Sequence, residues 1–303
     1  MMMYLDCLNF FKEYIGSYCM PDTVEYYNIN LRLFSSWLVG VKGTLRFDIN
    51  TLTKHDYISY ISFQRSRGVK NTSVRTYARA VKAFLRFCYN EGYLLNNITL
   101  NVKFPKSDKK IIIPLSQKRV AVLHSAMLKG YMSKRNICIF YLMLDCGLRL
   151  GEVVALNKAD VNFDDSYITV VNSKNNKSRI VPMSENVKWH LYQYINDYRY
   201  FSKTALILDN HYEKRINKNS IELVFNKLKR YDDDIHPHLL RHTFATSYIL
   251  GGGSLEVLRV LMGHADYNVT KEYLHIASQV RIADFDIYKL DDVFFKVYNY
   301  NKN

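Results

Sequence analysis

Apolar residues recur at steps of three and four along much of the chain, which predicts amphipathic helices. In residues 21–38, PDTVEYYNINLRLFSSWL, these positions are Val24, Tyr27, Leu31, Phe34 and Leu38. Asp22 or Thr23 is placed to cap this helix after Pro21. The segments SQKRVAVLHSAML and NICIFYLMLDCG also predict helices. Because the second segment is apolar nearly all round, we expect it to be buried.

Residues 71–92, NTSVRTYARAVKAFLRFCYNEG, predict a helix that carries two stripes. The apolar stripe is Val74, Ala78, Val81, Leu85 and Cys88. The basic stripe is Arg75, Arg79, Lys82 and Arg86. No Asp or Glu occurs between Tyr57 and Asn90. A solvated helix face normally mixes both charges, so the basic stripe indicates contact with the phosphates of DNA or RNA. An ordinary exposed helix face is the alternative.

Short β-branched segments, DVNF, YITVVN and SRIVPM, predict strands in the second half of the chain. The last two are joined by SKNN, a composition typical of turns, which places Lys174 at the tip of a hairpin. A boundary is indicated at 103–114, where two prolines bracket a basic, polar stretch. We therefore expect a mainly α fold with a small antiparallel β-sheet. Its parts are a helical domain at 1–104, a linker at 105–113, and an α+β domain at 114–303 with a tail at 281–303.

Composition narrows the class of protein. At 303 residues, with 48% hydrophobic and 23% charged residues, the chain is a globular protein of about two domains. No apolar run approaches the ~18 residues of a membrane span, and the N-terminus does not resemble a signal peptide. The net charge of +14 points to a polyanionic partner, with nucleic acid as the leading class. Five scattered cysteines without a C-x-x-C pair indicate a reducing compartment, the cytoplasm, and three of them lie in apolar stretches typical of a core.

Three segments carry candidate chemistry. Arg149 lies in the apolar stretch LMLDCGLRLGEVVAL and needs an anion, which is either Glu152 at i+3 or a bound phosphate. In HPHLLRHTFAT, His238 and Arg241 share a helix face, where a guanidinium fork and an imidazole suit phosphate chemistry. The spacing of His238 and His242 also allows a metal ion, although no HExxH motif occurs, and histidines that only cap the helix are a third reading.

The last segment, LMGHADYNVTKEYLHI, offers His264 after a glycine and Tyr273 nine residues later. Because Tyr273 also has helical spacing to apolar neighbours, a core tyrosine is the alternative. With 25 tyrosines in the chain, residue chemistry alone does not single this one out.

In order along the chain, these segments resemble the tyrosine recombinase (phage integrase) family. CGLRLGEVVAL is similar to the T-G-L-R-x-x-E-x-x-x-L block, SKNNKSRIVPM to the G-K-G-x-K-x-R-x-V-P hairpin, HPHLLRHTFAT to H-x-L-R-H, and LMGHADYNVTKEY to L-G-H followed by the tyrosine. The resemblance implies the catalytic residues Arg149, Lys174, His238, Arg241, His264 and Tyr273, with Glu152 in support. Ser173 and Asn175 depart from the family's hairpin glycines, and Ser247 stands where many members carry histidine. The first domain resembles the family's helical core-binding domain.

The resemblance also implies a mechanism. Tyr273 would attack a DNA phosphodiester and form a 3′-phosphotyrosine link, with His238 as general base, His264 as hydrogen-bond donor, Arg149 and Arg241 as the phosphate clamp, and Lys174 as the acid for the leaving 5′ oxygen. No cofactor and no metal ion is expected.

The partners expected from the resemblance are double-stranded DNA with a specific recombination site, three further copies in a homotetramer, and accessory proteins of unknown identity, without a membrane. The length favours a simple Xer-like type without an arm-binding domain. The tail would pack on a neighbouring protomer or on its own domain. A DNA-binding architectural or regulatory protein without cleavage, and a metal-dependent nuclease that uses His238 and His242, are the competing functions.

Overall fold

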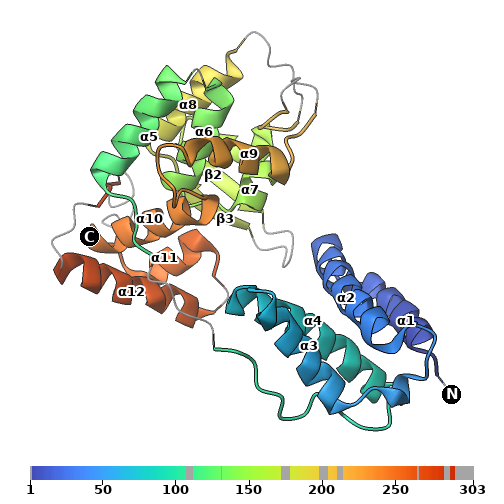
Figure 1. The fold of residues 1–303 in the computed structure, drawn as a ribbon. Coiled ribbons are helices and arrows are strands. Elements are labelled where there is room, and N and C mark those ends of the chain that lie inside the picture. The colour runs from blue at the N-terminus through green and yellow to red at the C-terminus, as the bar shows by residue number, and fades with distance from the viewer. Residues whose placement is uncertain are drawn as a thin grey trace. The chain divides into compact units, whose positions relative to one another are not determined.

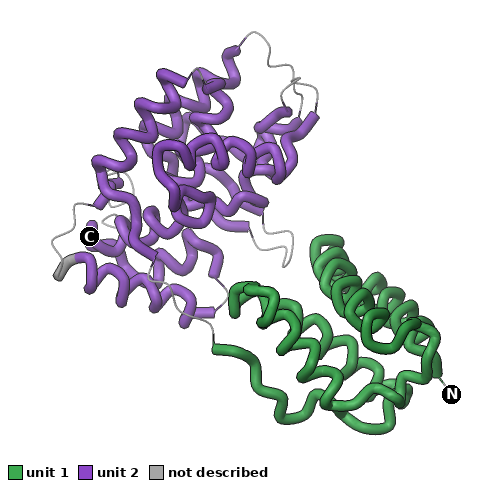
Figure 2. The backbone as a smooth tube through the Cα atoms, in the orientation of Figure 1, with its two compact units in different colours: residues 1–110 green, residues 111–303 purple. Residues whose placement is uncertain are grey.

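The chain forms two compact units, residues 1–110 and 111–303 (Figure 2). The computed structural model describes residues 2–106, 112–130, 132–171, 178–197, 204–209, 214–264, 266–282 and 287–290. Each unit has its own hydrophobic core, and each is described by itself below. No helix among these residues is both long enough and apolar enough to cross a membrane.

Unit 1 is a helical bundle in which α4 is central (Figure 1). Its elements are α1 (Tyr4–Tyr18), α2 (Pro21–Lys42), the 3-10 turn η1 (Ile49–Thr51), α3 (Lys54–Ser66) and α4 (Asn71–Asn90). The helices α1, α2 and α3 all pack on α4. The whole apolar stripe predicted for α4, Val74, Ala78, Val81, Leu85 and Cys88, is buried in that contact. Burial of this stripe stabilises the bundle, since apolar area removed from water is worth ~25 cal/mol per Å².

The start of α2 differs from the expectation. Neither Asp22 nor Thr23 caps the helix, because Pro21 is its first residue and Met20 stands at the cap position without a side-chain hydrogen bond. Proline suits the first helical position because the N–H it lacks would have no partner there. The apolar positions Leu31, Phe34 and Leu38 are buried as predicted.

Unit 2 combines a small sheet with helices. Its helical elements are α5 (Gln117–Lys129), α6 (Lys134–Leu144), α7 (Leu150–Ala155), the 3-10 turn η2 (Lys158–Asp160), α8 (Glu185–Ile195), α9 (Lys218–Leu228), α10 (Pro237–Leu250), α11 (Leu255–Met262) and α12 (Tyr267–Ile282). Helix α6 is buried on nearly all sides, as its apolar sequence predicts, and packs against α8 and α10. Helix α10 in turn contacts α11 and α12 (Figure 1).

The sheet is antiparallel with the order β1–β2–β3, formed by β1 (Val161–Asn162), β2 (Tyr167–Val171) and β3 (Ser178–Pro182). In the β2–β3 hairpin Val171 pairs with Ser178 and Thr169 with Ile180. The mostly helical fold with a small antiparallel sheet confirms the predicted fold class. The connection 172–177, which contains Lys174, lies outside the described residues.

A short segment near the C-terminus is docked on unit 2 of its own chain. Ile287 pairs with Ser116, and the Tyr288 amide donates to the Leu115 carbonyl. The Tyr288 hydroxyl donates to Asp145 Oδ1 at 2.9 Å, and Asp145 is only 1% exposed. Ser184 donates to the other oxygen of the same carboxylate. Residues 287–290 therefore lie in cis, and the rest of the tail is outside the described residues.

The Tyr288 hydroxyl is expected to stabilise unit 2. Tyr288→Phe removes a donor from a buried carboxylate, which costs about 1–3 kcal/mol of unfolding free energy. Urea unfolding in a Trp37→Phe background measures this, because Trp189 then reports unit 2 alone. Tyr192→Phe is the control, because Tyr192 is 58% exposed on α8. Equal losses in both variants would contradict the expectation.

Candidate active site

The site is built around the first turn of α7, which is set up by a glycine. Gly147 has a φ of +62°, in the left-handed region, and a Cβ there would lie 2.4 Å from the Phe244 ring. Only glycine meets both conditions. This turn leads into Arg149, the residue before α7, whose backbone N–H donates to Glu152 Oε2 at 2.7 Å. Glu152 thus satisfies one of the free N–H groups at the helix start, where the helix dipole also favours a negative charge.

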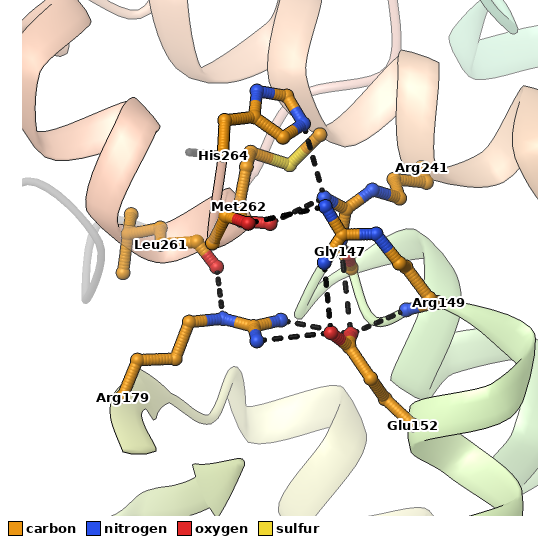
Figure 3. A network of polar contacts seen from close by, with 9 residues as sticks. Gly147, Arg149, Glu152, Arg179, Arg241, Leu261, Met262 and His264 are labelled. Carbon is orange, nitrogen blue, oxygen red and sulfur yellow. Dashed lines mark hydrogen bonds and ion pairs between the residues drawn. The ribbon is translucent and has the colours of Figure 1, made fainter. Parts of the chain in front are cut away.

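Glu152 forms ion pairs with three arginines from three parts of unit 2 (Figure 3). Arg149 donates to Oε1 at 2.9 Å, and Arg179 from β3 binds both oxygens, at 3.0 and 2.8 Å. Arg241 from α10 lies 3.8 Å from Oε2. The carboxylate is 12% exposed, so these pairs are held away from water. A bidentate arginine–carboxylate pair of this kind is strong and fixes the geometry of both groups.

The charge of Glu152 is stabilised by this arrangement. Burial alone would raise its pKa, but the hydrogen bonds and charge of Arg179, the Arg149 backbone N–H and the charge of Arg241 lower the pKa to about 2. The carboxylate is therefore fully ionised at neutral pH. It offsets part of the repulsion between the three guanidinium groups.

Arg241 is the most buried of the three arginines around Glu152, with a side chain 6% exposed. It donates to the backbone carbonyls of Gly147 and Met262. Burial first, and then the charge of Arg149, lower its pKa to about 9, so it remains a cation at neutral pH. The side chain of Arg149 is 35% exposed, which makes it the most accessible of the three arginines.

His264 follows the turn at the end of α11 and is held at both ring nitrogens. Its Nε2 lies 3.2 Å from Arg241 Nη2, and its Nδ1 lies 3.0 Å from the Thr270 hydroxyl. A guanidinium can only donate, so Nε2 is the acceptor and Nδ1 carries the proton. Burial, then the charges of Arg241 and Arg149, lower the pKa of His264 to about 4. The expected role of donor to a phosphate would require Nε2 to leave Arg241 and take up a proton.

Tyr273 lies on α12 between two imidazole rings. Its ring is stacked on His264 at 6.2 Å between centroids and tilted against His242 at 5.3 Å. The residue is 5% exposed, and burial raises the pKa of its hydroxyl, opposed by the charges of Arg241 and Arg149. The phenol is thus protonated and largely covered in this arrangement.

His238 is exposed near the start of α10, one helical turn before His242. Partial desolvation of the His238 ring is the largest cause that lowers its pKa, followed by the charges of His236 and Arg241. The neutral, proton-accepting form of His238 therefore prevails at neutral pH. His242 is the histidine that packs on Tyr273. Among the described residues there is no group of three or more His, Cys, Asp or Glu placed to hold a metal ion.

The structure brings most of the sequence-predicted residues together. Direct contacts join Arg149, Glu152, Arg241 and His264, and Tyr273 stacks on the last of these. Lys174 lies outside the described residues. The sequence analysis did not single out Arg179, although the arginine of the hairpin pattern G-K-G-x-K-x-R-x-V-P falls on it and was the available signal.

Comparison with known proteins identifies the family. The model of the phage integrase family matches residues 114–279, more than half of the chain. The chain therefore belongs to the phage integrase family.

Relatives match along most of the chain. It is similar to tyrosine recombinase XerC of Pediococcus pentosaceus, at 28% identity over 91% of this chain and 95% of the relative. It is also similar to tyrosine recombinase XerD of Proteus mirabilis, at 26% identity over 85% and 84%. A solved lambda integrase dimer bound to a COC′ core site shares the fold, with a TM-score of 0.72 at 15% identity over 90% of this chain and 95% of that one.

Glu152 is expected to make stability depend on acid. Its folded pKa of about 2 is below the ordinary 4.5, so its contribution is complete above about pH 4.5 and is lost as the pH falls towards 2. The contribution is on the order of 3 kcal/mol. Glu152→Gln should remove this acid-dependent part and, at neutral pH, cost about 3–5 kcal/mol by leaving buried arginines without a counter-charge.

Urea unfolding at several pH values between about 2 and 6 measures this dependence. Glu222→Gln, an exposed change on α9, is the matched control and should keep the wild-type slope. Parallel curves for wild type and Glu152→Gln would show that Glu152 does not carry the acid dependence.

Proposed function

We propose that this chain is a site-specific DNA recombinase that cleaves and rejoins DNA strands through a 3′-phosphotyrosine intermediate on Tyr273. The observation that carries the proposal is the network of the cations Arg149 and Arg241 and the neutral His264 beside Tyr273. The names of the relatives, tyrosine recombinases, support the same reaction. The biological task is integration, excision, resolution or inversion.

In the proposed reaction the Tyr273 oxygen bonds to phosphorus while the bond from phosphorus to the 5′ oxygen breaks. His238 takes the phenol proton, because its lowered pKa leaves it neutral at pH 7. Lys174 returns a proton to the leaving 5′ oxygen. One phosphate ester replaces another, so the step needs no nucleotide hydrolysis and can run backwards to rejoin the strand.

The arginines would stabilise the charge that builds on the phosphate. Arg149 is partly exposed, and Arg241 is fixed by the carbonyls of Gly147 and Met262. Groups held in place before the reaction need no reorganisation when charge develops, and one such donor is worth ~3–4 kcal/mol of transition-state stabilisation. Because Tyr273 is 5% exposed, DNA binding must open the packing of α12 before the phenol reaches phosphorus.

The competing function is DNA binding without cleavage. A binding protein needs cations on its surface, but it has no use for a tyrosine packed against two imidazoles that are neutral at pH 7. The arrangement at Tyr273 therefore favours the enzyme.

Covalent protein–DNA adducts provide the decisive test. Wild type and Tyr273→Phe are expressed in cells, purified under denaturing conditions, and the attached DNA is sequenced. We expect adducts with wild type at one paired sequence and none with Tyr273→Phe. Tyr267→Phe is the matched control, because Tyr267 is an exposed tyrosine on the same helix and should keep the adducts.

Three outcomes would contradict the proposal. Adducts that persist with Tyr273→Phe would assign the nucleophile elsewhere, and cleavage that disappears with a chelator would favour the metal-dependent nuclease. Adducts absent from every variant, with DNA binding intact, would leave the binding protein.

Unit 1 is proposed to bind the DNA backbone through the basic stripe of α4. Its four residues are not equivalent in the structure. Arg79 and Arg86 are exposed, and among the described residues neither has a hydrogen bond or ion pair. Arg75 instead donates to the Pro105 carbonyl at 3.0 Å, and Lys82 lies 5.5 Å from the centre of the Phe104 ring. These two hold the chain that leaves the bundle.

The stripe should therefore divide into two functional pairs. The logarithm of the affinity falls as the logarithm of the salt concentration rises, and each lost phosphate contact makes this fall less steep by about 0.9. The double variant Arg79→Gln with Arg86→Gln should therefore make the slope less steep by about two. Arg75→Gln should leave the slope near that of wild type. Fluorescence anisotropy of a duplex of mixed sequence at several salt concentrations measures both. Equal salt slopes for wild type and all variants would show that the basic stripe of α4 does not contact DNA phosphates.

The assembly proposed for the reaction is a homotetramer on two DNA sites. It forms in the cytoplasm and includes accessory proteins in some reactions. The dimeric lambda integrase on its core site supports an assembly of several copies. The reduced, buried cysteines Cys7, Cys88, Cys138 and Cys146 suit a reducing compartment.

A further inference from the structure

We infer that Arg179 is a positioning residue of the proposed cleavage reaction: it fixes the Glu152 carboxylate, and through it Arg149, against the turn that carries His264. This inference rests on the proposed function for its role in catalysis. The contacts that support it come from three elements that are distant along the chain.

Arg179 is bound by partners on two sides (Figure 3). Its Nη1 and Nη2 donate to the two Glu152 oxygens, and its Nε donates to the Leu261 carbonyl at 2.7 Å. The side chain is 7% exposed, so it is not free to bind DNA. An arginine that is buried and donates to protein groups at all three of its nitrogens acts through those groups and not on the phosphate.

The partners of Arg179 are the supports of the proposed catalytic groups. Glu152 holds the Arg149 backbone N–H and side chain. Leu261 is in the last turn of α11, and the next residues, Met262 and Gly263, accept hydrogen bonds from Arg241 and Arg149. A Cβ on Gly263 would lie 3.0 Å from Arg179 Nη1, so the turn before His264 sits directly on this guanidinium.

Arg179 also belongs to the base of the hairpin. It is the second residue of β3 and pairs with Val170 on β2, directly after the connection 172–177. A single side chain therefore joins the sheet, the start of α7 and the end of α11. Lysine cannot replace it fully, because the fork geometry lets one guanidinium bind both carboxylate oxygens and a carbonyl.

The pKa of Glu152 depends on the charged and titratable groups that surround it. The charged groups are Arg149 directly before α7, Arg179 on β3 and Arg241 on α10, and the titratable His264 follows α11. Lys218 on α9 lies near the same turn of α7, with its Cε 3.7 Å from where a Gly151 Cβ would be. Arg179 is the largest of the influences that lower the pKa of Glu152.

A double-mutant cycle tests the inference. Arg179→Met, Glu152→Gln and the double variant are compared for the single-turnover rate of adduct formation on the duplex recovered from the wild-type adducts, and for its dissociation constant. We expect Arg179→Met to slow adduct formation about 10- to 100-fold, as small misplacements do, with little change in affinity. Because Arg179 acts through Glu152, the double variant should be slowed far less than the product of the two single effects.

Two further variants separate positioning from general stability. Arg179→Lys keeps the charge and should recover part of the rate, and it remains informative if Arg179→Met does not fold. Arg215→Met is the matched control, because Arg215 donates to the Val154 and Leu156 carbonyls at the other end of α7 without contacting Glu152. It should lower stability and leave the adduct rate near that of wild type.

A measurement without DNA keeps the two proposals distinguishable. Arg179→Met should remove a large share of the acid-dependent part of the unfolding free energy that Glu152→Gln removes, because Arg179 is the largest of the influences that lower the pKa of Glu152. If wild type forms no adducts, the proposed function fails, and this unfolding measurement still decides whether Arg179 controls Glu152. If wild type cleaves while Arg179→Met cleaves equally fast, or the two single effects multiply, the role of Arg179 is overturned.

Discussion

The buried carboxylate of Glu152 is the interaction on which the rest of the site depends. Three guanidinium groups come within 4 Å of it, and without its charge they would repel one another in a setting that excludes water. Its position at the start of α7 adds the helix dipole and a backbone N–H to its stabilisation. The ion pairs of this one carboxylate thus connect the sheet, the start of α7 and α10.

The arginines are held by the ends of helices and turns as much as by Glu152. The carbonyls of Gly147, Leu261, Met262 and Gly263 all accept from them, so backbone groups that a helix or turn leaves free become fixed supports. This arrangement aims cations at one place before any phosphate arrives. Donors that are held in place in this way need little reorganisation when negative charge develops beside them.

Sequence reasoning anticipated much of the local structure. The apolar stripe of α4 and the nearly uniform apolarity of α6 predicted burial, and both are buried, because side-chain periodicity maps directly onto a helix face. For Arg149 the sequence left an ion pair and a bound phosphate open. The structure shows the ion pair with Glu152, and 35% of the Arg149 side chain stays exposed. The start of α2 was predicted wrongly, because Pro21 enters the helix itself.

The sequence by itself determined the helix faces, the fold class and the order of the motifs, since these depend on neighbours a few residues apart. Only the tertiary structure decided that Arg179 binds Glu152, that Tyr288 reaches Asp145 across 143 positions, and that Tyr273 lies covered between two histidines. The basic stripe shows the same division: its periodicity was visible, but the engagement of Arg75 with Pro105 was not. Such contacts depend on how the elements pack, and a one-dimensional pattern contains no information on which distant groups share a buried space.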